Sequence, residues 1–205
     1  DHGTSRGLGD VYKRQLSFRG ILDLAKQKEF EIIWKPILVG GIFNSTNPSV
    51  YESRNNPVKE KLEYSQKDLA DWSEYRGITF NWPKIFPVNS VKAMRGCFYF
   101  IENKKIEPYV EAVFKAYWTD GENIAEDECL KSIVESLEIN SEEFLKFIND
   151  PKIKQRLIEN TQNLMDRGGF GSPTFFLNDV DMYFGNDRIQ LLACLLYTSD
   201  AADDL

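Results

Sequence analysis

The order of its periodic segments constrains the fold of this chain more than any other feature. Between about residues 57 and 167 the apolar residues recur at helical spacing, as in the stripe from Ile106 to Trp118. Asn140 and Asp150 stand where helix N-caps are expected in this block. Short runs rich in β-branched and aromatic residues lie on either side of it: EIIWKPI at 31–37, TFFL at 174–177 and MYF at 182–184. This order predicts an α/β fold with a large all-helical insertion.

The flanking segments predict the remaining elements. A helical pattern begins at Leu16, and residues 44–57, which are rich in Asn, Ser and Pro, indicate a loop. The pair Asn178–Asp179 is typical of a tight turn, so the two C-terminal runs are expected to form a hairpin. Asn186, after the breaking Gly185, is then expected to cap a final helix whose inward side chains are Ile189, Leu191 and Leu192.

Composition and charge exclude several classes of function. A formal net charge of −7 is unfavourable for binding nucleic acid or an anionic membrane surface. The only histidine is His2, and the three cysteines, Cys97, Cys129 and Cys194, lie far apart, so neither a metal site nor a disulfide framework is expected. Cys97 and Cys129 fall within helical patterns and are expected to be buried. This cysteine usage suits a reducing, cytoplasmic compartment.

The two ends of the chain differ in character from the rest. Residues 1–15 show no apolar period, and residues 194–205 carry no signal for a recognisable element. Both stretches resemble translated adapter sequence at the ends of a metagenomic fragment, and ordinary disordered termini are the alternative. We therefore expect the native domain to comprise residues 16–193, with the helical insertion at about 57–167.

One candidate for a binding site is the segment Gly171-Ser172-Pro173-Thr174 at the start of a strand. A cis Ser172–Pro173 bond would expose the backbone N–H and C=O of Ser172 to a peptide-like ligand. A trans proline that merely begins an edge strand is the alternative.

A second candidate is the helix start at Gly185-Asn186-Asp187-Arg188. Backbone N–H groups at a helix N-terminus bind carboxylates, and Asp187 could accept an ammonium group. The alternative is an ordinary cap with a solvated Asp187–Arg188 ion pair. Asn47 and Lys59, near the Gly40–Gly41 loop, are weaker candidates, because a single lysine in a polar loop is usually only solvated.

Five motifs together resemble one family. They are WKPILVGGIF at 34–43, PVK at 57–59, FPVNSVKAMR at 86–95, GFGSPTF at 169–175 and FGNDR at 184–188. In this order they resemble the 2-hydroxychromene-2-carboxylate isomerases and kappa-class glutathione transferases. The resemblance implies a DsbA-like thioredoxin fold in which residues 31–36, 174–177 and 181–184 share one sheet. The family's first strand is missing or replaced here, and Gly9–Arg14 are candidates to fill its place.

The resemblance also implies glutathione as the cofactor. Ser172, before a cis Pro173, would hold its cysteinyl part, and Asn186, Asp187 and Arg188 would hold its γ-glutamyl end. Further polar contacts are implied for Asn47 and Lys59, with Lys61 as a rival to Lys59 because the spacing to Asp68 is longer than usual.

The family's catalytic serine has no counterpart in this chain. That serine stabilises the glutathione thiolate, and the resemblance places it near positions 11–12, which are Val11 and Tyr12 here. Neither Ser5 nor Ser17 fits the motif. We therefore assign no catalytic residue and expect the chain itself to be inactive.

By resemblance, the parent protein would be a cytoplasmic homodimer that isomerises 2-hydroxychromene-2-carboxylate-type intermediates of aromatic degradation with glutathione. The partner would be a small aromatic-derived substrate. Three alternatives remain: a kappa-class glutathione transferase, a dithiol–disulfide oxidoreductase of the same superfamily, and a non-enzymatic interaction domain. No Cys-x-x-Cys is present, and a transferase would consume glutathione whereas an isomerase would return it.

Overall fold

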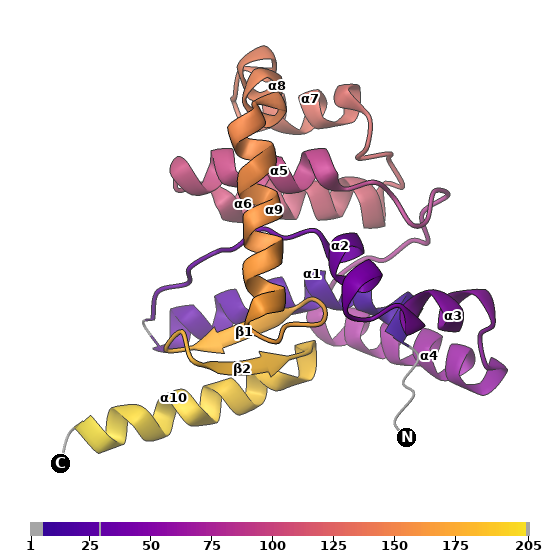
Figure 1. Ribbon diagram of the computed structural model, residues 1–205. Helices are drawn as coiled ribbons and strands as arrows, with labels where there is room; N and C mark the ends of the chain where they lie inside the picture. The colour runs from indigo at the N-terminus through magenta and orange to yellow at the C-terminus, as the bar shows by residue number, and fades with distance from the viewer. Residues whose placement is uncertain (1–5, 29, 204–205) are drawn as a thin grey trace. The chain divides into compact units, whose positions relative to one another are not determined.

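The computed structural model describes residues 6–28 and 30–203, with side chains for 15–28, 30–52 and 55–196. The chain divides into two compact units, whose elements are labelled in Figure 1. Unit 1 comprises the residues up to Ile33, Ile42–Gly77 and the residues from Gly168 onward. Unit 2 comprises Trp34–Gly41 and Ile78–Arg167.

Unit 1 is organised around helix α1, which packs against α3, α4 and α10. Between positions 16 and 24 the apolar side chains of α1 are buried: Leu16, Phe18, Ile21, Leu22 and Leu24. The elements with residues in this unit are α1 (Arg6–Lys28), α2 (Val39–Ser45), α3 (Ser49–Asn55), α4 (Lys59–Arg76), β1 (Thr174–Leu177), β2 (Asp181–Phe184), the 3-10 turn η2 (Asn186–Arg188) and α10 (Ile189–Asp203).

Strands β1 and β2 form the predicted antiparallel hairpin. The register runs from Thr174 opposite Phe184 to Leu177 opposite Asp181. Asn178 and Asp179 both have positive φ, at 51° and 60°, and these two residue types tolerate the left-handed conformation of a tight hairpin turn. The turn residues Asn178 and Asp179 therefore predicted the β1–β2 hairpin correctly.

Unit 2 is helical, as the periodicity predicted. Its elements are α5 (Val91–Glu102), α6 (Ile106–Phe114), the π-helical turn η1 (Lys115–Thr119), α7 (Asp127–Ser136), α8 (Ser141–Asn149) and α9 (Pro151–Asp166). Helix α5 packs against α6, α8 and α9, and its Phe100 ring stacks on Tyr109 at 4.3 Å between centroids. Two predicted N-caps are confirmed, because the side chains of Asn140 and Asp150 accept hydrogen bonds from the N–H groups of Glu143 and Lys152.

The predicted apolar stripe of residues 106–118 is buried at both of its ends. Ile106 and Tyr109 are buried at helical spacing, as expected. At η1 the chain adopts a π-helical turn, which holds more residues than an α-helical turn. Three consecutive residues are buried there: Tyr117 and Trp118, as predicted, and Ala116 in addition.

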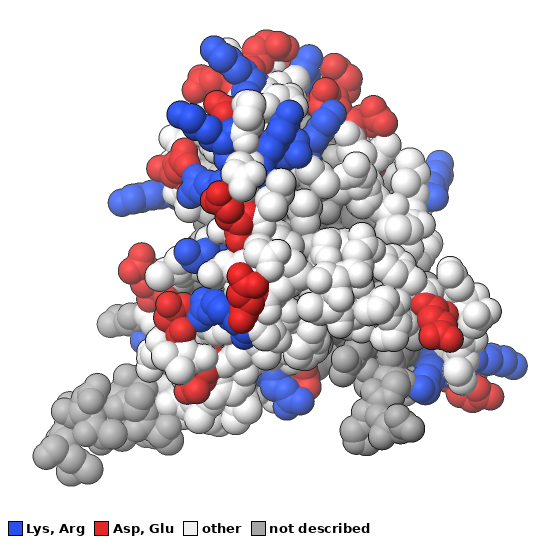
Figure 2. Space-filling model, in the orientation of Figure 1, with Lys and Arg blue, Asp and Glu red and all other residues white. Residues whose placement is uncertain are grey.

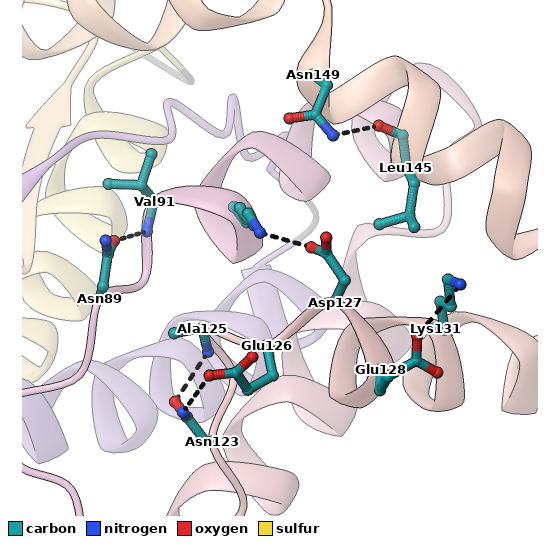
Figure 3. A network of polar contacts seen from close by, with 11 residues as sticks. Asn89, Val91, Asn123, Ala125, Glu126, Asp127, Glu128, Lys131, Leu145 and Asn149 are labelled. Atoms are coloured by element: carbon teal, nitrogen blue, oxygen red, sulfur yellow. Dashed lines mark hydrogen bonds and ion pairs between the residues drawn. The ribbon is translucent and has the colours of Figure 1, made fainter.

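Ion pairs join helices of unit 2, and Figure 3 shows the polar contacts around Asp127 and, within α7, the pair of Glu128 and Lys131. Lys92 on α5 pairs with Asp127 on α7 at 2.7 Å, and Lys131 on α7 pairs with Glu142 on α8 at 3.1 Å. Figure 2 shows basic and acidic side chains interspersed over α7 and α8 on this face, so neither sign forms a patch of its own there. Such exposed ion pairs each contribute little to the stability of the fold.

The prediction of a strand at 31–37 was wrong. Residues 30–38 have no regular secondary structure. Within unit 2, the side chains of α9 bind this backbone instead: Thr161 Oγ1 accepts a hydrogen bond from the Leu38 N–H at 2.9 Å, and Asn160 Nδ2 donates to the Pro36 carbonyl at 3.1 Å. The prediction rested on composition, whereas a strand also needs a partner strand to take up its N–H and C=O groups.

Three other expectations need correction. Gly9–Arg14 do not replace a strand, because their backbone belongs to α1. Residues 44–57 are not one loop, since they contain the end of α2 and all of α3, whose Val50 is buried. Leu191 does not point inward, because 42% of it is exposed, whereas Ile189 and Leu192 are buried as predicted. In the described part of the chain, none of the helices has the length and hydropathy to cross a membrane.

Candidate functional site

The hairpin brings the two C-terminal motifs together within unit 1. The Gly185 N–H donates to the Pro173 carbonyl at 3.1 Å, directly beyond the Thr174–Phe184 pair that begins the ladder. Pro173 and Gly185, the residues that adjoin Ser172 and Asn186 in the sequence, are therefore in direct contact. The Ser172–Pro173 peptide bond is cis, as predicted.

Two glycines allow this close approach. A Cβ atom on Gly171 would lie 2.8 Å from the ring of Phe184, which itself packs on Phe170 with 4.5 Å between centroids. Gly185 has a φ of +112°, which disfavours any other residue, and its Cβ would lie 2.6 Å from the Asp187 carboxylate. Gly171, before β1, thus leaves room for the Phe184 ring, and Gly185 supplies the positive φ between β2 and η2.

The three residues of η2 differ in exposure. Asn186 is buried, and its Oδ1 accepts a hydrogen bond from Ser17 Oγ of α1 at 3.4 Å. It does not cap the helix, so the predicted capping role is wrong. The Asp187 carboxylate lies 3.5 Å from the Arg188 guanidinium, and both side chains are at least half exposed. A pair so exposed is weak, which leaves both charges available to a ligand.

Asn47 and Lys59 lie on other elements of unit 1. Asn47 follows α2, and its Oδ1 accepts a hydrogen bond from Ser49 Oγ at 2.9 Å. Lys59 begins α4 and lies 3.8 Å from the Glu63 carboxylate, with 81% of its side chain exposed. Lys61 is exposed as well. Among the described residues these polar contacts of Asn47 and Lys59 are local, so the structure does not join them to the hairpin motifs.

The thiols of Cys97 and Cys129 are poor nucleophiles, because their pKa values are raised. Burial raises the pKa of Cys97 to about 12, and the buried position is the one predicted. Cys129 is only half-buried, contrary to expectation; burial, together with its hydrogen bond to the Glu122 carboxylate, raises its pKa to about 12. Both thiols are therefore protonated at neutral pH. In the described ranges, no three His, Cys, Asp or Glu side chains group as a metal site would require.

Val11 and Tyr12, which occupy the positions expected for the catalytic serine, lie in α1, and their side chains fall outside the described ones. The residue that sequence reasoning missed is Ser17. It was rejected because it fits no catalytic motif, yet its hydroxyl contacts a predicted site residue. No local pattern singles it out, since it is one polar residue within an apolar helix segment.

A model of the DsbA-like thioredoxin domain matches residues 15–196. The chain belongs to this family. The DsbA-like domain is 37% identical over 142 residues to a 2-hydroxychromene-2-carboxylate isomerase of Pseudomonas putida, covering 67% of this chain. It spans 66% of that relative's length, slightly less than two thirds. It is 28% identical over 180 residues to glutathione S-transferase kappa 1 of Homo sapiens, covering 79% of this chain and 76% of that protein.

A solved structure of a 2-hydroxychromene-2-carboxylate isomerase superposes on the DsbA-like domain with a TM-score of 0.77 at 25% identity. The alignment covers 94% of this chain and 92% of that one. These matches confirm the resemblance inferred from the five motifs, and with it the thioredoxin-like α/β fold with a helical insertion. In this chain the fold is mostly helical, with the two-stranded sheet of β1 and β2 among the described residues.

Proposed function

We propose that this domain serves glutathione-dependent cis–trans isomerisation of 2-hydroxychromene-2-carboxylate-type substrates. The observation that carries the proposal is the hairpin contact between Pro173 and Gly185, because it joins the two segments that we propose bind glutathione. The isomerases among the relatives support the reaction type, and the kappa-class relative supports glutathione. A homodimer in the cytoplasm is part of the same proposal.

The residues around the hairpin suit the amino-acid end of glutathione. That end carries a carboxylate and an ammonium group on one carbon. The exposed Asp187 carboxylate can accept the ammonium, and the Asn186 amide nitrogen with the N–H groups at the start of η2 can donate to the carboxylate. Arg188 adds a positive charge beside them. The backbone of Ser172 would pair with the peptide part, as a strand edge does.

The roles of Asn47 and Lys59 are weaker proposals. Lys59 is almost fully exposed, so it could reach a terminal carboxylate only as a solvated charge. Lys61, on the same helical turn of α4, remains its rival. Asn47 would contribute an amide once its bond to Ser49 is exchanged for one to the ligand.

Glutathione supplies a thiol nucleophile when bound. The residues of this chain bind and orient it, and they leave the thiol without the hydroxyl donor that the resemblance places near Val11 and Tyr12. Such a donor would lower the thiol pKa by roughly one to two units, which corresponds to about 1.4–2.7 kcal/mol. We therefore propose that this chain binds glutathione and has no measurable isomerase activity.

The test compares the chain with a variant in which residues 1–15 are replaced by a family-like strand that ends in Ser-Pro-Tyr-Ser. Absorbance follows the interconversion of 2-hydroxychromene-2-carboxylate and its ring-opened isomer, and total glutathione is measured before and after. The proposal expects turnover only by the variant, with all glutathione recovered.

Three results would contradict it. Net consumption of glutathione would identify a kappa-class transferase, and exchange with a disulfide substrate would identify an oxidoreductase. Equal turnover by the unmodified chain would show that the N-terminal serine segment is not required.

A further inference from the structure

A buried polar contact links α1 to the start of α10. Ser17 is 3% exposed and Asn186 is 6% exposed, and the serine hydroxyl donates to Asn186 Oδ1 at 3.4 Å. Burying a hydroxyl and an amide costs free energy unless each finds a partner. This hydrogen bond gives the Ser17 hydroxyl and the Asn186 amide oxygen a partner, although the two residues are 169 positions apart in the sequence.

The packing around this contact fixes its geometry. One turn beyond Ser17, a Cβ on Gly20 would lie 2.8 Å from Ile189 Cδ1, so glycine at this position gives the Ile189 side chain room against the backbone of α1. Ile189 is the buried first residue of α10 and follows Asn186 by three positions. Ser17 and Gly20 on α1 therefore face Asn186 and Ile189, which places one helical turn against another. We name this four-residue contact the α1–η2 seam.

We propose that Ser17 is a positioning residue that orients the Asn186 amide toward the carboxylate of an amino-acid group, such as the γ-glutamyl end of glutathione. The inference rests on the proposed function for the identity of the ligand. Oδ1 of Asn186 accepts the hydrogen bond from Ser17, so in this proposal the amide nitrogen is the side-chain donor for the ligand. Asp187, the next residue, presents the carboxylate for the ammonium group.

This arrangement gives Ser17 an indirect role. The hydroxyl sits behind Asn186 and is buried, so it acts through the amide and not on the ligand itself. Without it, the amide could rotate by half a turn and present its oxygen to the carboxylate, which is repulsive. The loss should therefore be specific to ligands that carry the γ-glutamyl carboxylate.

The experiment uses the full 205-residue chain and measures glutathione binding by calorimetry. We expect Ser17→Ala to weaken binding about three- to ten-fold, the effect of one lost hydrogen bond. Ser17→Thr keeps the hydroxyl and should restore most of the affinity. Ser73→Ala is the matched control, because Ser73 is also a buried serine of unit 1 and its hydroxyl donates to Leu69 O within α4. Its affinity should equal that of the parent chain.

Two further readouts separate positioning from a general loss of structure. In the Asn186→Ala background, Ser17→Ala should no longer change the affinity, because in this proposal the hydroxyl influences the ligand through that amide. Cysteinylglycine, which lacks the γ-glutamyl group, should bind the parent and Ser17→Ala equally. A loss of the same size in the Asn186→Ala background, or for the dipeptide, would overturn the inference.

The Asn186 side-chain amide signal in a ¹⁵N NMR spectrum tests the contact without glutathione. Ser17→Ala should shift and broaden it, whereas Ser73→Ala should not. An unchanged signal would overturn the inference whatever the ligand. If Ser17→Ala changes the signal but the parent chain does not bind glutathione, the contact between Ser17 and Asn186 stands. The proposed function and the ligand assignment are then overturned.

Discussion

Replacing Asp187 by asparagine removes one negative charge from η2 and leaves the size of the side chain unchanged. In the proposed site this carboxylate accepts the ammonium of the γ-glutamyl group. We expect Asp187→Asn to weaken glutathione binding, because an amide oxygen is a poorer partner for an ammonium group than a carboxylate is.

The magnitude follows from the exposure of the group. A hydrogen bond to a charged partner contributes about 1.5–3 kcal/mol when it is well shielded. The Asp187 side chain is 64% exposed, so solvent screening places it in the lower half of that range. The substitution also frees Arg188, 3.5 Å away, to attract the ligand carboxylate, which offsets part of the loss. The expected net loss is about 1–2 kcal/mol, or roughly a five- to thirty-fold change in affinity.

Calorimetry with two ligands measures this loss and its origin. Glutathione should bind the variant more weakly, and cysteinylglycine should bind both proteins alike. The matched control is Asp179→Asn, which makes the same charge change at the exposed hairpin turn, where asparagine also tolerates positive φ. If Asp187→Asn binds glutathione as tightly as Asp179→Asn does, Asp187 is not part of the site. Equal losses for both ligands would refute the assignment to the γ-glutamyl end.

Two predictions concern stability. Gly96→Ala would put a Cβ 2.2 Å from Tyr109 Oη, so we expect overpacking to lower the free energy of unfolding by about 1–3 kcal/mol. Gly40→Ala has open space around it and should change that free energy by less than about 1 kcal/mol. Urea titrations of both variants measure the difference. Burial raises the pKa of Cys97 from 9.0 to about 12 in the folded chain, so the protonated thiol favours folding fully below pH 9 and this contribution is lost as pH rises toward 12. The unfolding midpoint should therefore fall more steeply between pH 9 and 11 in the parent than in Cys97→Ala, and equal slopes would contradict the buried thiol.

Local signals account for the parts of the fold that the sequence predicted. The N-caps at Asn140 and Asp150 and the turn at Asn178–Asp179 are interactions between residues at most four positions apart. Their side chains satisfy nearby backbone groups in whatever tertiary setting follows. The same holds for the apolar period of unit 2, whose predicted members Tyr117 and Trp118 are buried even though they lie in the π-helical turn η1.

The parts that were not predicted depend on partners distant in sequence. Residues 31–37 have strand composition, but their backbone binds α9 through Thr161 and Asn160. Composition reports how well a segment suits a sheet, and it carries no information on whether a neighbouring strand is there to pair with it. Leu191 illustrates the same limit on a helix, since an apolar residue at the edge of a buried face can still be exposed.

The candidate site combines both kinds of information. Its hairpin motifs were predictable, because β1 and β2 are adjacent in sequence and a tight turn joins them. The α1–η2 seam was not predictable. Its members are two pairs spaced three positions apart, Ser17 with Gly20 and Asn186 with Ile189, and neither pair is a recognisable pattern in the sequence. Asn186 belongs to both: the hairpin places its backbone through the Gly185–Pro173 hydrogen bond, and α1 orients its side chain through Ser17. A substitution in the hairpin should therefore displace the whole helix start, whereas one at Ser17 should alter only the direction of a single amide.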